Sequence, residues 1–149
     1  MASHWYVYAV AKMMLAYLVT GADIRLALLM TNTTADTEED KEFVSGFTTL
    51  DEMDGANYVR KALASEAIET DTTNNRGEFS GTSPVTWTAL GAGTRQVAGI
   101  LLYKHVTNDA DSIPVAWIDT GGFPITANGG DLTVTINAEG LVQVTVPAF

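Results

Sequence analysis

Apolar residues fall along the chain in short runs separated by turn residues, a pattern typical of β-strands. The segment Ile24–Met30 is mostly apolar and is bounded by polar residues, which predicts a core strand. The run Gln96–Lys104 is almost continuously apolar and predicts a central strand that is covered on both faces. The segment Ile113–Asp119 predicts a further strand, and Pro114 near its start favours an edge position.

Two later segments alternate apolar and polar residues with period two. The alternation runs through Leu132–Ile136 and again through Val142–Val146, with the turn sequence Asn137–Gly140 between them. This arrangement predicts an antiparallel hairpin. Shorter or less regular patterns predict four more strands, at 58–63, 66–70, 78–80 and 85–89.

The longest apolar stretch runs from His4 to Thr20 and predicts an α-helix. Ser3 is a candidate N-cap, and Gly21 is a candidate C-terminal stop. The stretch has no basic start, carries Lys12 in its middle, and is shorter than the ~20 residues that a membrane-spanning helix needs. We therefore expect a buried or half-buried helix and neither a secretory signal nor a membrane span.

The segment Asp36–Glu42 carries five acidic residues and one lysine. It predicts a short helix that begins at Asp36 or Thr37 and ends near Gly46, with Phe43 among the residues that anchor it. A run this acidic usually forms a solvated surface.

Together these patterns predict a mainly β fold, an antiparallel β-sandwich or barrel of about eight strands. An N-terminal α-helix and a short acidic helix complete it. Residues 1–149 show no internal repeat and no linker, so we expect a single domain.

The net charge of the chain limits the kinds of partner that it is expected to bind. With 18 acidic and 8 basic residues the formal net charge is −10, which argues against binding to a nucleic-acid backbone. The chain has no cysteine, which excludes disulfides, thiolate metal sites and a cysteine nucleophile. The basic residues are scattered singly, and we expect three arginines on or near predicted strands to form ion pairs that orient loops or a partner chain: Arg25, Arg60 and Arg95.

Few residues suggest catalysis or metal binding. His105 precedes Asp109 and Asp111, so a base with an orienting acid is conceivable, but a surface histidine at a strand end is the more common case. The pairs Asp51/Asp54 and Asp109/Asp111 offer hard oxygen ligands for calcium, yet neither lies in a complete EF-hand loop. We expect no enzymatic activity, no metal and no cofactor.

Three aromatic residues, Trp87, Tyr103 and Trp117, are candidates for stacking on a sugar. Their positions inside predicted strands favour core packing instead. A glycan-binding module therefore stays an alternative to a purely structural role.

A series of segments along nearly the whole chain resembles a known family. They are Trp5-Tyr6, the strand I-x-L-A-L-L from Ile24, Glu42-Phe43, E-x-x-G-x-x-Y from Glu52 and V-T-W from Val85. The series continues with R-x-V-A-G-x-L-L-Y-K from Arg95, I-P-V-A-W-I-D from Ile113 and G-G-D-L-T-V-T-I-N-A-E-G-L-V from Gly129. This series resembles small structural proteins of tailed bacteriophages.

The resemblance implies a virion component, a capsid decoration or cement protein on the outer surface of the head. Such a protein bridges major capsid subunits and often forms trimers, without contact to DNA or membrane. The alternatives are a tail, neck or head-fibre component and a virion-surface glycan-binding module. We expect contacts to the capsid or another partner from the N-terminal and acidic segments, namely from Trp5, Tyr6, Asp36, Glu38, Glu39 and Phe43.

Overall fold

The structure is a computed structural model in which residues 6–10, 16–19 and 23–145 are described. Its contacts gather in two compact units. Unit 1 comprises 1–22, 63–84 and 135–149, and unit 2 comprises 23–62 and 85–134. Neither unit is a continuous stretch of chain, and the backbone passes between them at four points.

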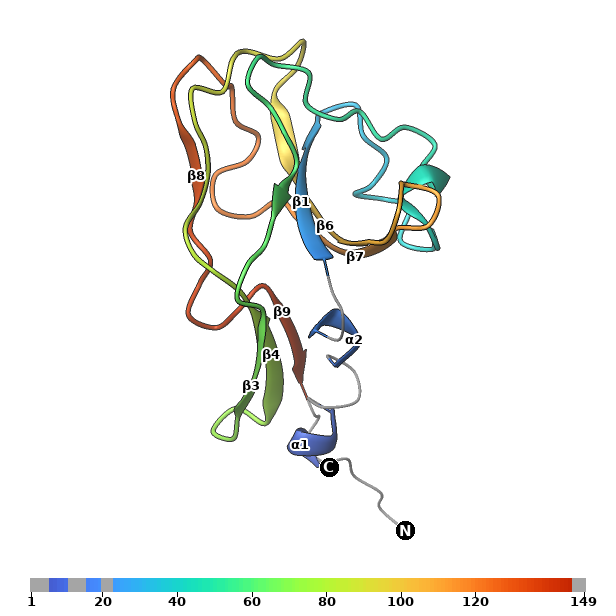
Figure 1. The fold of residues 1–149 in the computed structure, drawn as a ribbon, viewed down its shortest axis with the longest axis vertical. Coiled ribbons are helices and arrows are strands. Elements are labelled where there is room, and N and C mark those ends of the chain that lie inside the picture. The colour runs from blue at the N-terminus through green and yellow to red at the C-terminus, as the bar shows by residue number, and fades with distance from the viewer. Residues whose placement is uncertain (1–5, 11–15, 20–22, 146–149) are drawn as a thin grey trace. The chain divides into compact units, whose positions relative to one another are not determined.

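The main sheet of unit 2 has the strand order β2-β1-β6-β7, and every neighbouring pair is antiparallel (Figure 1). The strands are β1 (Asp23–Met30), β2 (Lys61–Ala62), β6 (Val97–His105) and β7 (Ile113–Ile118). The apolar run expected to form a central strand is β6, between β1 and β7. The strand with Pro114 is at the end of the strand order, which confirms its expected edge position.

One face of this sheet is covered by the segment 31–50, which contains the 3-10 turn η2 (Val44–Gly46). The buried residues of this face, called here the sheet-face cluster, are Ala27, Leu29, Ala35, Val44, Leu101 and Tyr103, with Phe47, Leu50 and Trp117 partly buried against them. A smaller sheet of unit 2 pairs β5 (Val85–Trp87) with β8 (Leu132–Val134), and the Trp87 side chain is fully buried.

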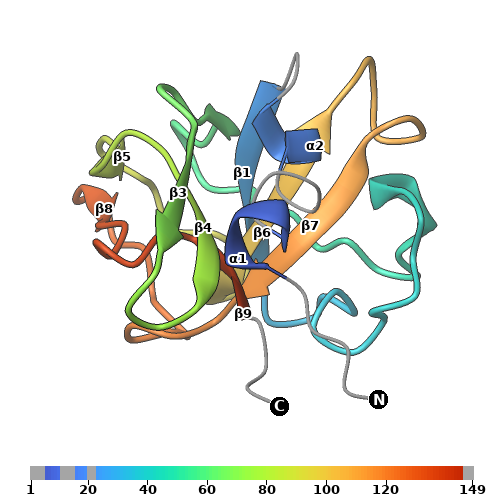
Figure 2. The ribbon, with the colours of Figure 1, turned by 90° about the horizontal axis from the view of Figure 1, so that it is seen from below.

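Unit 1 contains a three-stranded antiparallel sheet in the order β3-β4-β9. Its strands are β3 (Ala67–Asp71), β4 (Arg76–Ser80) and β9 (Val142–Thr145), and Phe79 of β4 is fully buried. The short helix α1 (Val7–Val10) lies against β4 (Figure 2), and the short helix α2 (Ala16–Val19) contacts β3.

Both α-helices fall inside the stretch 4–20 that was expected to be helical, and residues 11–15 lie outside the described part of the chain. No helix among the described residues has the length and apolarity needed to span a bilayer. The three antiparallel sheets confirm the expected mainly β, β-sandwich-like class.

The predicted C-terminal hairpin is wrong. Residues 132–134 pair with β5 in unit 2, whereas 142–145 pair with β4 in unit 1. Period-two alternation specifies which face of a strand is apolar but does not specify the partner strand. The turn before β9 does form, with Gly140 at φ +83° and its N–H donating to the carbonyl of Asn137.

The acidic segment is not an α-helix either. Residues 36–43 lie in turns and bends, and the only helical turn within 36–46 is the 3-10 turn at Val44–Gly46. The threonine hydroxyls that flank this segment bind Glu38, and these side-chain hydrogen bonds compete with helix formation.

Candidate functional site

Unit 2 has a cavity of about 360 Å³ at the edge of its main sheet. The strand β7 contributes Pro114, Val115, Ala116 and Trp117 to its wall. The remaining lining comes from the covering segment and from β6: Ala35, Asp36, Glu38, Glu39, Lys41, Phe47 and Leu101. The cavity therefore combines apolar residues of the sheet-face cluster with charged residues of the acidic segment, and its volume is in the range of small ligand sites.

Glu38 fixes the shape of the charged wall. Its carboxylate accepts hydrogen bonds from the Thr48 backbone N–H at 2.7 Å, the Thr48 hydroxyl at 2.6 Å and the Thr34 hydroxyl at 2.7 Å. These bonds, those from Thr48 first, lower the pKa of Glu38 from 4.5 to about 2. The side chain is ionised at neutral pH and holds the two ends of the 34–48 loop together.

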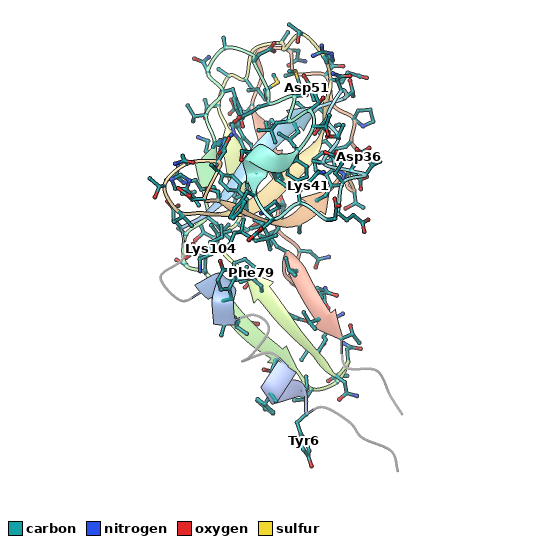
Figure 3. All side chains as sticks on the ribbon, turned by 90° about the vertical axis from the view of Figure 1, so that its right-hand side faces the viewer. Tyr6, Asp36, Lys41, Asp51, Phe79 and Lys104 are labelled. Carbon is teal, nitrogen blue, oxygen red and sulfur yellow. The ribbon has the colours of Figure 1, made fainter. Side chains whose placement is uncertain are left out.

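The other charged residues of the wall differ in how they are paired. Lys41 Nζ lies 3.5 Å from Glu38 and 3.8 Å from Asp40, so its charge is shared within the loop. Asp36 and Glu39 are exposed and have no ion-pair or hydrogen-bond partner for their carboxylates among the described residues. Asp36 and Lys41 are labelled on unit 2 in Figure 3. The wall therefore presents two carboxylates that no cation of the described chain neutralises.

Trp117 is the largest side chain that lines the cavity. Its indole ring lies against Gly99 of β6, where an added Cβ would be 2.5 Å from Trp117 Cζ2. The indole Nε1 is buried and has no hydrogen-bond partner among the described residues. An unpaired buried donor of this kind costs about 1–3 kcal/mol, so the ring is held in place by packing and not by a polar contact.

The structure brings together three of the six residues expected to contact a partner. Asp36, Glu38 and Glu39 line the cavity, whereas Phe43 is half-buried beside η2 and does not line it. Tyr6 is in unit 1 and is 72% exposed, and Trp5 lies outside the described residues. Sequence reasoning missed the cavity itself, because the covering segment and β7 contribute residues that are more than sixty positions apart in the chain.

A second polar group of unit 2 is the Arg60 cluster, made of Glu52, Tyr58, Arg60, Tyr103 and Asp109. The Arg60 guanidinium donates to both oxygens of Glu52, at 2.7 and 2.6 Å, and to both oxygens of Asp109, at 2.5 and 2.8 Å. It also donates to the buried Tyr103 hydroxyl at 3.1 Å. These hydrogen bonds, led by those from Asp109 and Glu52, raise the pKa of Arg60.

Tyr58 belongs to the same cluster, because its hydroxyl donates to Glu52 at 2.7 Å. Burial, followed by the Glu52 charge, raises the pKa of Tyr58, so its hydroxyl stays protonated. The polar groups of the cluster are thus bound to one another. The cluster stabilises the fold by joining separate segments of the chain.

His105 forms no hydrogen bond with Asp109 or Asp111, the two aspartates considered as its orienting acid. Asp109 is bound to Arg60, which lowers the Asp109 pKa, and Asp111 accepts from Asn108 at 3.1 Å. The Nδ1 atom of His105 lies 3.3 Å from the Ser112 hydroxyl. That hydroxyl is fully buried and already donates to the Asn108 carbonyl at 2.7 Å, so a substrate cannot reach it as a nucleophile.

The expected arginine ion pairs are confirmed. Arg25 bonds Asp23, Arg60 bonds Glu52 and Asp109, and Arg95 bonds Asp51 at 2.8 Å. Loop contacts also occupy both oxygens of Asp54, which accept from the Thr94 N–H and hydroxyl at 2.8 and 2.9 Å. The aspartates considered as calcium ligands therefore already have partners in loops.

Three carboxylates of unit 1, those of Asp71, Glu78 and Glu139, have ligand atoms that lie within 4.8 Å of one another. Arg76 forms ion pairs with all three, at 3.2 Å to Asp71 and 2.6 Å to Glu78, and also with Glu139. The guanidinium supplies the positive charge that a metal ion would otherwise supply, so the group is explained as an arginine-centred ion-pair cluster.

Two of the three aromatic residues considered for sugar stacking are core residues. Trp87 and Tyr103 are fully buried, and Trp87 Nε1 donates to the Val59 carbonyl at 2.8 Å. Trp117 alone of the three lines the cavity. Comparisons of the chain with protein-family models, curated proteins and solved structures find no match.

Proposed function

We propose that this chain is a structural protein of a tailed-bacteriophage virion, a capsid decoration protein that bridges major capsid subunits on the outer surface of the head. The proposal rests first on the whole-chain resemblance of its strand and turn segments to such proteins. The observation that carries it further is the cavity of unit 2, a preformed depression in an ordered sheet edge with apolar residues and two unneutralised carboxylates.

The charge of the chain supports an outer position. A chain of net charge −10 is repelled by packaged DNA, whereas the outer face of a shell carries no such penalty. The polar clusters support a non-enzymatic role, since their carboxylates and hydroxyls are already bound to each other. We expect the chain to associate as a trimer.

Quantitative mass spectrometry of purified virions tests the proposal, with the major capsid protein as the internal standard. A decoration protein is present in hundreds of copies for each particle. A dozen copies or fewer would contradict the proposal and indicate a tail, neck or head-fibre component. Light scattering on the purified chain measures whether it is a trimer in solution.

A further inference from the structure

We infer that the cavity of unit 2 binds a basic side chain, preferably arginine, that is presented next to apolar residues by a partner protein. The inference goes beyond the proposed function in naming the chemistry of the contact. It rests on that function only in taking the partner to be a capsid subunit.

Charge complementarity argues for a cation. The cavity wall has three carboxylates and one lysine, and Glu38 and Lys41 pair with each other. Asp36 and Glu39 remain without a partner among the described residues. A monovalent cation that spans both carboxylates gains two charge-assisted contacts.

The apolar lining argues for a cation with an apolar body. Phe47, Leu101 and Trp117 form a surface beside the carboxylates, and Pro114 to Ala116 extend it along β7. An arginine side chain has an aliphatic stem, and its planar guanidinium stacks on aromatic rings as well as binding carboxylates. A small hydrated metal ion makes no use of such a surface.

The composition of the chain argues that the basic group comes from another protein. All four arginines of the chain, Arg25, Arg60, Arg76 and Arg95, already form ion pairs within it. A second copy of this chain therefore offers no unpaired arginine.

The test uses the full-length protein and the peptide acetyl-Leu-Arg-Leu-amide, with the citrulline peptide as a neutral control of the same shape. Binding is followed by NMR through the indole N–H signal of Trp117, which the variant Trp117→Phe assigns. We expect the arginine peptide to shift this signal and to bind at least about fivefold more tightly than the citrulline peptide.

The double variant Asp36→Asn/Glu39→Gln changes only exposed side chains and should reduce the affinity for the arginine peptide to that of the citrulline peptide. The control Glu66→Gln/Glu69→Gln removes the same charge from unit 1 and should leave the affinity within twofold of the parent protein. Equal loss in both double variants would overturn the site, because it would indicate attraction to the net charge alone.

Three other outcomes would also overturn the inference. One is the absence of any Trp117 shift at millimolar peptide. Another is equal binding of the two peptides. The third is a stronger shift of the same signal with methyl glucosides, which would assign the cavity to a glycan. None of these arms uses virions, so failure here leaves the copy number of the chain in the particle, and with it the proposed function, to be judged separately.

Discussion

Unit 2 and unit 1 each place one arginine among several carboxylates. The arginine of unit 2 also binds a buried tyrosine hydroxyl, whereas two of the three carboxylates bound by the arginine of unit 1 belong to its own hairpin. Arg60 of unit 2 joins Glu52, Tyr103 and Asp109, and Asp109 is 49 positions away in the chain. Arg76 of unit 1 bonds Asp71 and Glu78 of its own hairpin, together with Glu139.

The two units also differ in how many apolar residues they bury. Unit 2 buries most of β1 and β6, whereas the main buried aromatic residue of unit 1 is Phe79. Both units therefore join segments that lie far apart in the chain, but among the described residues unit 2 has the larger buried apolar core. The cavity of unit 2 is built on this larger core, which holds the segments that line it in fixed positions.

The largest expected effects come from the buried aromatic residues of the two units. Trp87→Ala in unit 2 and Phe79→Ala in unit 1 should each lower the free energy of unfolding by about 3–5 kcal/mol. If the units are separately cooperative, hydrogen exchange in Phe79→Ala should accelerate in β3, β4 and β9 and stay unchanged in β1 and β6. Equal acceleration in both units would show that the chain unfolds as the single domain expected from its sequence.

A smaller loss is expected from the arginine of unit 2. Arg60→Met leaves the carboxylates of Glu52 and Asp109 without their cation in a half-buried site, and we expect a loss of about 2 kcal/mol. Denaturant titration measures it, with Arg76→Met as the matched variant in unit 1. The Arg76 side chain is no more exposed than that of Arg60, 16% against 21%, so the two variants should destabilise the chain comparably, and a loss in only one of them would contradict this expectation.

Gly99 tests how firmly the cavity wall is built. In Gly99→Ala the new Cβ would be 2.5 Å from Trp117 Cζ2 and 2.7 Å from the Ile118 carbonyl oxygen, so the ring must move. We expect a loss of about 1–2 kcal/mol and a shifted indole signal for Trp117. Gly121→Ala is the comparison: it has positive φ but no atom within 4 Å of the added Cβ, so the Trp117 signal should not change. An unshifted Trp117 signal in Gly99→Ala would show that the wall yields easily.

The smallest effect is the pH dependence of the loop at the cavity. The Glu38 pKa is lowered from 4.5 to about 2, so the stabilisation by its hydrogen bonds is complete above pH 4.5. As the pH falls from 4.5 to about 2, the unfolded chain takes up the proton first and this stabilisation is lost. Glu38→Gln should therefore differ from the parent protein in its denaturation midpoint clearly at pH 6 and only slightly at pH 2. A difference that stays constant with pH would assign the effect to packing.

The local pattern of apolar residues correctly predicted the strands that are covered on both faces and the strand at the sheet edge. The strands β1 and β6 were recognised because both faces are covered, and Pro114 marked the edge strand because it lacks a backbone donor. The hairpin at 132–146 was mispredicted because β8 and β9 have similar alternation but pair with different strands.

The candidate site could be predicted only in part. The run of acidic residues indicated a surface, and three of its members do line the cavity. The other wall comes from β7. The pattern of residues within the acidic segment or within β7 does not indicate that these two segments lie side by side. The tryptophan in that wall gave no separate signal, since an aromatic residue inside a strand is normally a core residue.

The four crossings of the backbone between the units have a consequence for biosynthesis. In the described part of the chain, the sheets of unit 2 use no strand beyond residue 134, whereas the sheet of unit 1 needs β9 at 142–145. On the ribosome, every strand of unit 2 is therefore made before unit 1 can acquire its third. A nascent chain that stops before residue 142 has all the strands of the cavity-bearing unit and leaves β4 with an unpaired edge.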